Sequence, residues 1–287
     1  MLKNIYYRFK NGLHLAAESF AMLWHHPVLL LYYLGLLALY IFVFVIAYNI
    51  IGHTGIASIS NDFQTPNTNL LADVIPQSGG LIYLGFLASI FTNIFLRTLL
   101  SFALIFHAHT FLTKEYRTMS EIYALTKQKW PTVLKWSLLV TAATFAVQLL
   151  TFSPIDQKII TPVVSAAGTT WFILTFFVLP ILTLTKANIM QSISTSTYYC
   201  AKQGVKIMGG LFWMGLVYII LLISNLFISN YLIPAQLSEA FMDGSLFFIN
   251  ALFGTVLLLF KTKLFHQVQL QAQKATLNSM PPDYSQF

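Results

Sequence analysis

The residue whose chemistry is most unusual for its surroundings is Arg97. It lies deep inside an apolar stretch, residues 81–106, with Asn93 one helical turn before it and Thr92 beside that, and the stretch holds no Asp or Glu. An arginine at mid-bilayer costs about 2.5–3.5 kcal/mol on insertion scales, and such residues often mark ligand or ion pathways. These three residues form a candidate polar intramembrane site for an anionic lipid or solute. The alternative is a structural arginine that snorkels to the inner interface or bonds helix carbonyls.

Two pairs of histidines raise the question of a metal site. His25 and His26 lie at the start of one apolar stretch, and His107 and His109 lie at the end of another. Neighbours at i+1 and i+2 do not share a helix face, and no carboxylate joins either pair. The sequence therefore predicts interfacial histidines, with no metal and no cofactor.

The sequence contains no catalytic signature that we recognise. The phosphate-binding loop, the G-x-S-x-G nucleophile elbow and the H-E-x-x-H zinc motif are all missing. Only nine residues are acidic, which argues against a proton-coupled pump and an intramembrane acid–base hydrolase. We expect a protein that is not an enzyme.

Proline and glycine mark two further positions within apolar stretches. Pro180 lies inside the fourth stretch, where it removes a backbone hydrogen bond and should kink the helix. Gly209, Gly210 and Gly215 begin the fifth stretch, and small residues let helices approach closely. The sequence predicts a kink at the first position and close packing at the second.

The composition and the long apolar stretches predict that transmembrane helices carry these residues. Hydrophobic residues make up 57% of the 287 residues and charged residues only 9%, against about 25% charged in soluble domains. A helix needs about 20 apolar residues to cross a bilayer. The predicted spans are 27–51, 81–106, 133–152, 162–185, 205–228 and 241–260. We expect an all-α polytopic bundle of six transmembrane helices over residues 1–266, followed by a polar tail, 267–287.

Basic residues predict the orientation. Lys158 lies in a loop on one side of the membrane, and Arg97 lies within a span. The other basic residues all fall on the opposite side: Lys3, Arg8, Lys10, Lys114, Arg117, Lys127, Lys129, Lys135, Lys186, Lys202, Lys206, Lys261, Lys263 and Lys274. Loops rich in Lys and Arg stay cytoplasmic, so we expect a protein of a bacterial inner membrane with both termini on the cytoplasmic side. The expected partners are anionic lipid headgroups and membrane proteins, not nucleic acid.

Amphipathic segments precede three of the spans, on the predicted cytoplasmic side. They are residues 2–24, residues 120–130 before Pro131, and residues 189–203 before Gly204. Each is predicted to form an interfacial helix, and together they suggest a threefold repeat of interfacial helix, outward span, loop and inward span. In the first segment Phe9, Leu13, Phe20 and Trp24 are expected to face lipid.

Three segments resemble a known family. They are residues 170–182, with the sequence TWFILTFFVLPIL and a basic Ser/Thr-rich segment after it, residues 12–27 and residues 120–136. These are similar to a family of six-span bacterial inner-membrane proteins known only as a domain of unknown function. The chain departs from that family at Thr118, Met119 and Ser120, where Gly is common. The resemblance implies six helices and assigns no functional residue.

Together these observations favour a non-enzymatic membrane protein. It is expected to assemble with other subunits or to handle lipid or another amphiphile within the bilayer. One alternative is a small transporter or permease subunit with Arg97 lining the path. A second alternative is a membrane-embedded enzyme that modifies lipids.

Overall fold

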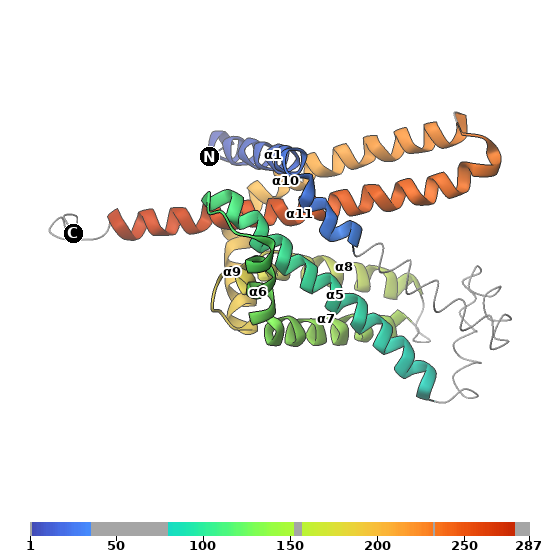
Figure 1. Ribbon diagram of the computed structural model, residues 1–287, viewed down its shortest axis with the longest axis horizontal. Helices are drawn as coiled ribbons and strands as arrows, with labels where there is room; N and C mark the ends of the chain where they lie inside the picture. The colour runs from blue at the N-terminus through green and yellow to red at the C-terminus, as the bar shows by residue number, and fades with distance from the viewer. Residues whose placement is uncertain (1, 36–79, 152–156, 232, 279–287) are drawn as a thin grey trace. The chain divides into compact units, whose positions relative to one another are not determined.

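The computed structural model describes residues 2–35, 80–151, 157–231 and 233–278, and this part of the chain contains helices and no strand (Figure 1). Its elements are α1 (Leu2–His25), η1 (Pro27–Leu30), α5 (Gly80–Thr113), α6 (Met119–Gln128), α7 (Trp130–Thr151), α8 (Gln157–Thr175), α9 (Val178–Leu184), α10 (Ile189–Tyr231) and α11 (Ala235–Asn278). The predicted all-α class is confirmed for these residues.

Five helical segments within the described residues are long and apolar enough to cross a membrane. They are Leu87–Thr113, Trp130–Val147, Ile160–Leu184, Ile189–Tyr231 and Phe241–Lys274. Each overlaps one predicted span. The first predicted span, 27–51, lies mostly outside the described residues. The chain therefore has the helices of a multi-pass membrane protein.

The last two helices are much longer than predicted. α10 has 43 residues, which is about 65 Å at 1.5 Å per residue, against about 30 Å of hydrocarbon. The prediction that Gly204 ends a separate amphipathic helix is wrong, because α10 continues through it. A helix-interior glycine costs only about 1 kcal/mol, and buried residues on both sides of Gly204 hold the helix together. α11 has 44 residues and runs past residue 266, where the sequence predicted the polar tail.

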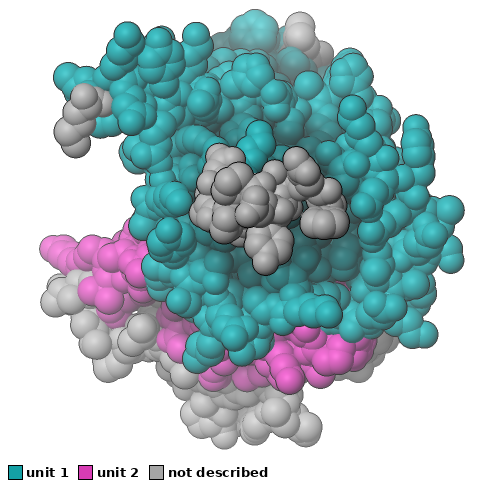
Figure 2. Space-filling view, turned by 90° about the vertical axis from the view of Figure 1, so that its left-hand side faces the viewer, with its two compact units in different colours: residues 1–34, 101–129, 171–287 teal, residues 35–100, 130–170 magenta. Residues whose placement is uncertain are grey.

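The chain divides into two compact units, coloured separately in Figure 2. Unit 1 comprises residues 1–34, 101–129 and 171–287, and unit 2 comprises residues 35–100 and 130–170. Within unit 2 the Phe95 ring packs edge-on against Trp130, with 4.7 Å between ring centroids. Unit 1 contains the buried core, the pocket and the lysines described below, whereas Thr92, Asn93 and Arg97 belong to unit 2.

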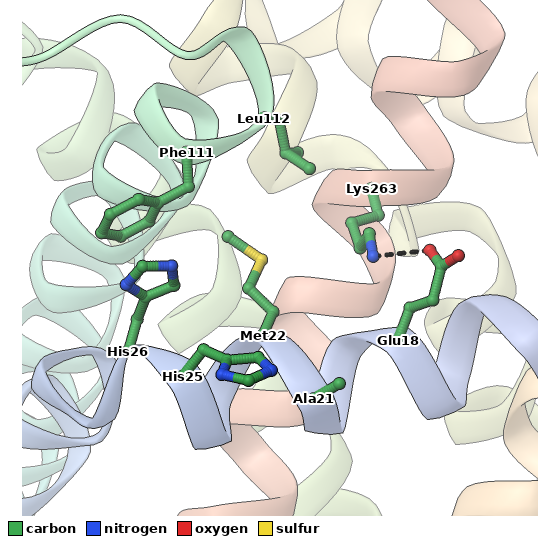
Figure 3. Close-up of a pocket in the computed structure, with 8 residues that line it drawn as sticks. All are labelled: Glu18, Ala21, Met22, His25, His26, Phe111, Leu112 and Lys263. Atoms are coloured by element: carbon green, nitrogen blue, oxygen red, sulfur yellow. Dashed lines mark hydrogen bonds and ion pairs between the residues drawn. The ribbon is translucent and has the colours of Figure 1, made fainter.

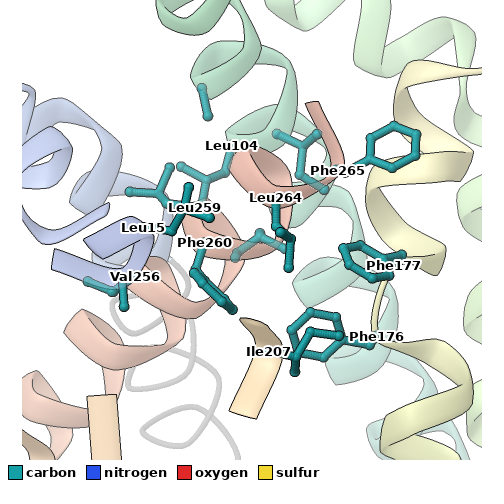
Figure 4. Close-up of a cluster of buried hydrophobic side chains, with 14 of the residues drawn as sticks. Leu15, Leu104, Phe176, Phe177, Ile207, Val256, Leu259, Phe260, Leu264 and Phe265 are labelled. Carbon is teal, nitrogen blue, oxygen red and sulfur yellow. The ribbon is translucent and has the colours of Figure 1, made fainter. Parts of the chain in front are cut away.

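The core of unit 1 gathers around α11. Phe260 and Leu264 of α11 are fully buried, and in Figure 4 they lie between Leu15 of α1 and the rings of Phe176 and Phe177. Aromatic rings bring large buried areas, so this cluster fixes the rotation of α11 about its axis.

Helix α1 packs against both α10 and α11. Several residues on the buried face of α1 have small side chains or none, namely Gly12, Ala16 and Ser19. The prediction that Phe20 faces lipid is wrong, because its ring lies 5.1 Å from Trp213 and 5.5 Å from Phe253 between centroids. The small buried residues let α1 approach so closely that flanking aromatic rings also reach the neighbouring helices.

Candidate functional site

The predicted intramembrane site lies on α5. Arg97 and Thr92 are exposed and Asn93 is half-buried, so this part of α5 does not enclose the guanidinium. The Thr92 hydroxyl donates to the carbonyl of Ala88 at 2.8 Å, within its own helix. A ligand-binding role for Arg97, Asn93 and Thr92 stays a prediction.

The helical stretch around Pro180 is interrupted. α8 ends at Thr175 and α9 begins at Val178, so Pro180 is the third residue of α9. In a continuous helix the proline ring would clash with the carbonyl of Phe176, four residues earlier. The interruption lies at Phe176 and Phe177, where that clash would fall.

Helix α10 supplies hydrogen bonds to the backbone at this break. The Ser196 hydroxyl accepts from the Phe177 N–H at 3.0 Å, and the Cys200 thiol donates to the Ile173 carbonyl at 3.1 Å. Ser196 and Cys200 are four residues apart and share one helix face. Non-helical backbone at membrane depth is tolerated only where neighbours satisfy it, and α10 does this here.

Ser196→Ala should therefore destabilise the protein by about 1–3 kcal/mol, because it leaves a buried N–H without its partner. The measurement is denaturation by sodium dodecyl sulfate in mixed micelles, followed by tryptophan fluorescence. Thr197→Ala is the control, since Thr197 is exposed and its hydroxyl bonds only within α10. Equal stability of the two variants would show that the Ser196 bond does not support the break.

A lysine lies beside the same break. The ammonium of Lys261, on α11, lies 5.1 Å from the ring centroid of Phe172 and 4.7 Å from that of Phe176. The sequence predicts that Lys261 follows the sixth span, which is expected to end at residue 260. The structure places it inside a continuous helix instead, between the buried residues Phe260 and Thr262.

A second lysine, Lys129, lies at the C-terminal end of α9. Lys129 Nζ donates to the carbonyls of Leu182 at 2.9 Å and Thr185 at 2.6 Å. Lysines commonly bond the last carbonyls of a helix and interact favourably with its dipole. Partial burial lowers the pKa of Lys129 from its usual value. This lysine has a structural role, so it is not a candidate ligand site.

A pocket of about 300 Å³ lies between α1, α5 and α11 (Figure 3). It is lined by Glu18, Ala21, Met22, His25, His26, Phe111, Leu112 and Lys263. Lys263 forms an ion pair with Glu18 at 2.7 Å, and His14 Nδ1 lies 2.9 Å from the same carboxylate. The pocket thus combines charged groups with an apolar wall.

The Phe111 ring of the pocket packs against two histidines, of which His26 lines the pocket and His107 does not. His26 stacks on Phe111 with 3.8 Å between ring centroids, and His107 stacks on the same ring at 5.0 Å. The hydroxyl of Tyr32 lies 3.1 Å from His107 Nδ1. Among the residues that the structure describes, no three His, Cys, Asp or Glu gather as a metal site would require.

The comparisons with known proteins found no match: no family model, no curated protein and no solved structure resembles this chain. The pocket and the lysines of unit 1 are therefore the features from which a function is proposed.

Proposed function

We propose that this protein is a non-enzymatic integral membrane protein that binds the headgroup of an anionic phospholipid in the pocket between α1, α5 and α11. The observation that carries the proposal is the mixed lining. His25, His26 and Lys263 offer hydrogen-bond donors, and Met22 and Phe111 offer apolar surface. Ligand pockets typically combine an apolar wall with a few well-placed polar groups, and a phospholipid has both kinds of surface.

The place of the pocket along the helices supports a membrane-surface ligand. His25 and His26 directly precede Pro27, the first residue of the first predicted span, and Phe111 lies two residues before the end of α5. These are the ends of apolar segments, where headgroups meet protein. In the orientation predicted from the basic residues this is the cytoplasmic boundary, whose anionic lipids attract Lys and Arg.

The ion pair in the pocket leaves room for a phosphate. A lysine ammonium carries three donor hydrogens, and the bond to Glu18 Oε2 uses one of them. Lys263 itself is mostly buried, with 15% of its side chain exposed, whereas Glu18 is 43% exposed. Lys263 lines the pocket, so its remaining donor hydrogens are available to a phosphate oxygen that enters there.

Lys263→Gln should reduce the anionic phospholipid that remains bound through purification by about tenfold or more, since truncating one partner of a desolvated charge pair costs at least about 2 kcal/mol. The measurement is mass spectrometry of lipids released from protein purified in mild non-ionic detergent. The matched control is Lys274→Gln, an exposed lysine on the same helix and outside the pocket. Equal lipid on both variants would reject the pocket as the binding site.

A further inference from the structure

Lys261 is a charged side chain held in an apolar setting. Its helix neighbours Leu259, Phe260 and Thr262 are each at most 1% exposed, and Lys261 itself is half-buried. Its ammonium lies over the faces of Phe172 and Phe176. Cation–π contacts compensate only part of the cost of removing a charge from water, so the energetics favour a negative partner.

Three of the described carboxylates have other partners. Among the described residues, Glu18 pairs with His14 and Lys263, and Glu115 pairs with Arg117. Glu121 is used in the capping box that begins α6, accepting from the Thr118 N–H at 2.7 Å. Within the described part of the chain the ion pairs join other residues, and an anion beside Lys261 would offset the cost of burying its charge.

The surroundings of Lys261 are open on one side. Phe176 is 2% exposed, but Phe172 is 37% exposed and Ile173 is 50% exposed, and both precede the end of α8 by only two or three residues. Of the two rings beside the ammonium, Phe176 is therefore buried and Phe172 lies at the surface. This surface belongs to a segment apolar enough to span a membrane, so acyl chains are its natural neighbours.

From this geometry we infer that Lys261, Phe172 and Phe176 form a second lipid site, separate from the pocket, for a singly charged oxyanion carried on an acyl chain. One ammonium balances one negative charge. The nearest lysine along the chain, Lys263, is paired with Glu18. A fatty acid carboxylate and the phosphodiester of a diacyl lipid both meet this requirement, whereas the doubly charged phosphate of a monoester does not.

A structural role and a ligand-binding role for Lys261 predict different effects of Lys261→Met on the melting temperature. α8 ends at Thr175, and a cation near the C-terminus of a helix is favourable. If that is its only role, Lys261→Met should melt at a lower temperature in detergent and respond to lipid as the wild type does. If Lys261 is a ligand site, the apolar replacement should melt at the same or a higher temperature without lipid, because a half-buried charge has been removed.

The test compares melting temperatures of delipidated protein in non-ionic detergent, with and without phosphatidylglycerol, oleate or phosphatidylcholine. We expect the first two to stabilise the wild type and phosphatidylcholine to have little effect. Lys261→Met should be stabilised less by these two lipids than the wild type, whereas Lys261→Arg, which keeps the positive charge, should be stabilised as much as the wild type. The control is Lys202→Met, because Lys202 also lies over an aromatic ring, that of Tyr198 at 5.8 Å, but is exposed. If only one of the two anionic lipids acts through Lys261, that lipid identifies the oxyanion as a phosphodiester or a carboxylate, and if both do, the site accepts either.

A second measurement on the wild-type protein does not depend on a variant that folds. Amine-reactive labelling, quantified by peptide mass spectrometry, should be reduced at Lys261 about tenfold or more when an anionic lipid occupies the site, with labelling at Lys202 unchanged. Unchanged labelling of Lys261 at saturating lipid would overturn the inference. Loss of lipid binding in Lys263→Gln together with a normal response of Lys261→Met would also overturn it and leave the proposed pocket intact.

Discussion

Gly12→Ala should cost about 3 kcal/mol or more of unfolding free energy, at the upper end of the range for overpacking. A Cβ on Gly12 would overlap the carbonyl oxygen of Lys206 and come within 3.0 Å of the Gly210 nitrogen. These are backbone atoms, so no side chain can rotate away, and α1 would have to separate from α10. A Cβ on Gly209 would overlap the Phe9 carbonyl in the same way, which makes the crossing a two-sided contact.

The measurement for Gly12→Ala is denaturation by sodium dodecyl sulfate in mixed micelles. Gly204→Ala is the control, because no atom lies within 4 Å of a Cβ there. That variant should be unchanged or gain up to about 1 kcal/mol, as expected when alanine replaces glycine inside a helix. A Gly12→Ala protein as stable as the control would mean that α1 does not pack on α10 at this depth.

These glycines show how far the sequence specifies the packing. The sequence predicted close approach at Gly209, Gly210 and Gly215, yet no atom lies within 4 Å of a Cβ at Gly215. Composition indicates which helices can approach a neighbour, but not which face of the helix the neighbour covers. Gly12 was not predicted because its partner atoms are almost 200 residues away along the chain.

Composition alone also failed to indicate which charged residues lie beside possible binding partners. Arg97 was noticed because it interrupts an apolar stretch, and the structure leaves it exposed on α5. Lys261 and Lys263 served only to predict the orientation and were not predicted as site residues, because hydropathy falls at Lys261 and the predicted span ends at residue 260. Hydropathy indicates where an apolar stretch ends, but it does not indicate where the helix ends. The helix continues as long as its backbone hydrogen bonds and packing are favourable. Only the continuous helix α11 places these lysines beside aromatic rings and a carboxylate.

Phe260→Ala should cost about 3–5 kcal/mol in the same denaturation experiment, the range for truncating a fully buried phenylalanine. The Phe260 ring is 0% exposed, and its centroid lies 6.3 Å from that of Phe176. The control is Phe248→Ala, because Phe248 lies on the same helix but is 46% exposed. That change should cost much less, since little buried surface is lost.

Gly210→Ala gives a specific check on this contact, because a Cβ on Gly210 would overlap the end of the Phe260 ring. Alone it should cost about 1–3 kcal/mol through overpacking. In the Phe260→Ala background the added methyl group would enter the space that the ring has left, so the double variant should be more stable than the sum predicts by about 0.5–3 kcal/mol. Strict additivity would contradict the contact. Because Phe260 directly precedes Lys261, the contact also fixes which side of α11 carries the ammonium towards Phe172, so loss of the ring should weaken the lipid response at Lys261 as well as the fold.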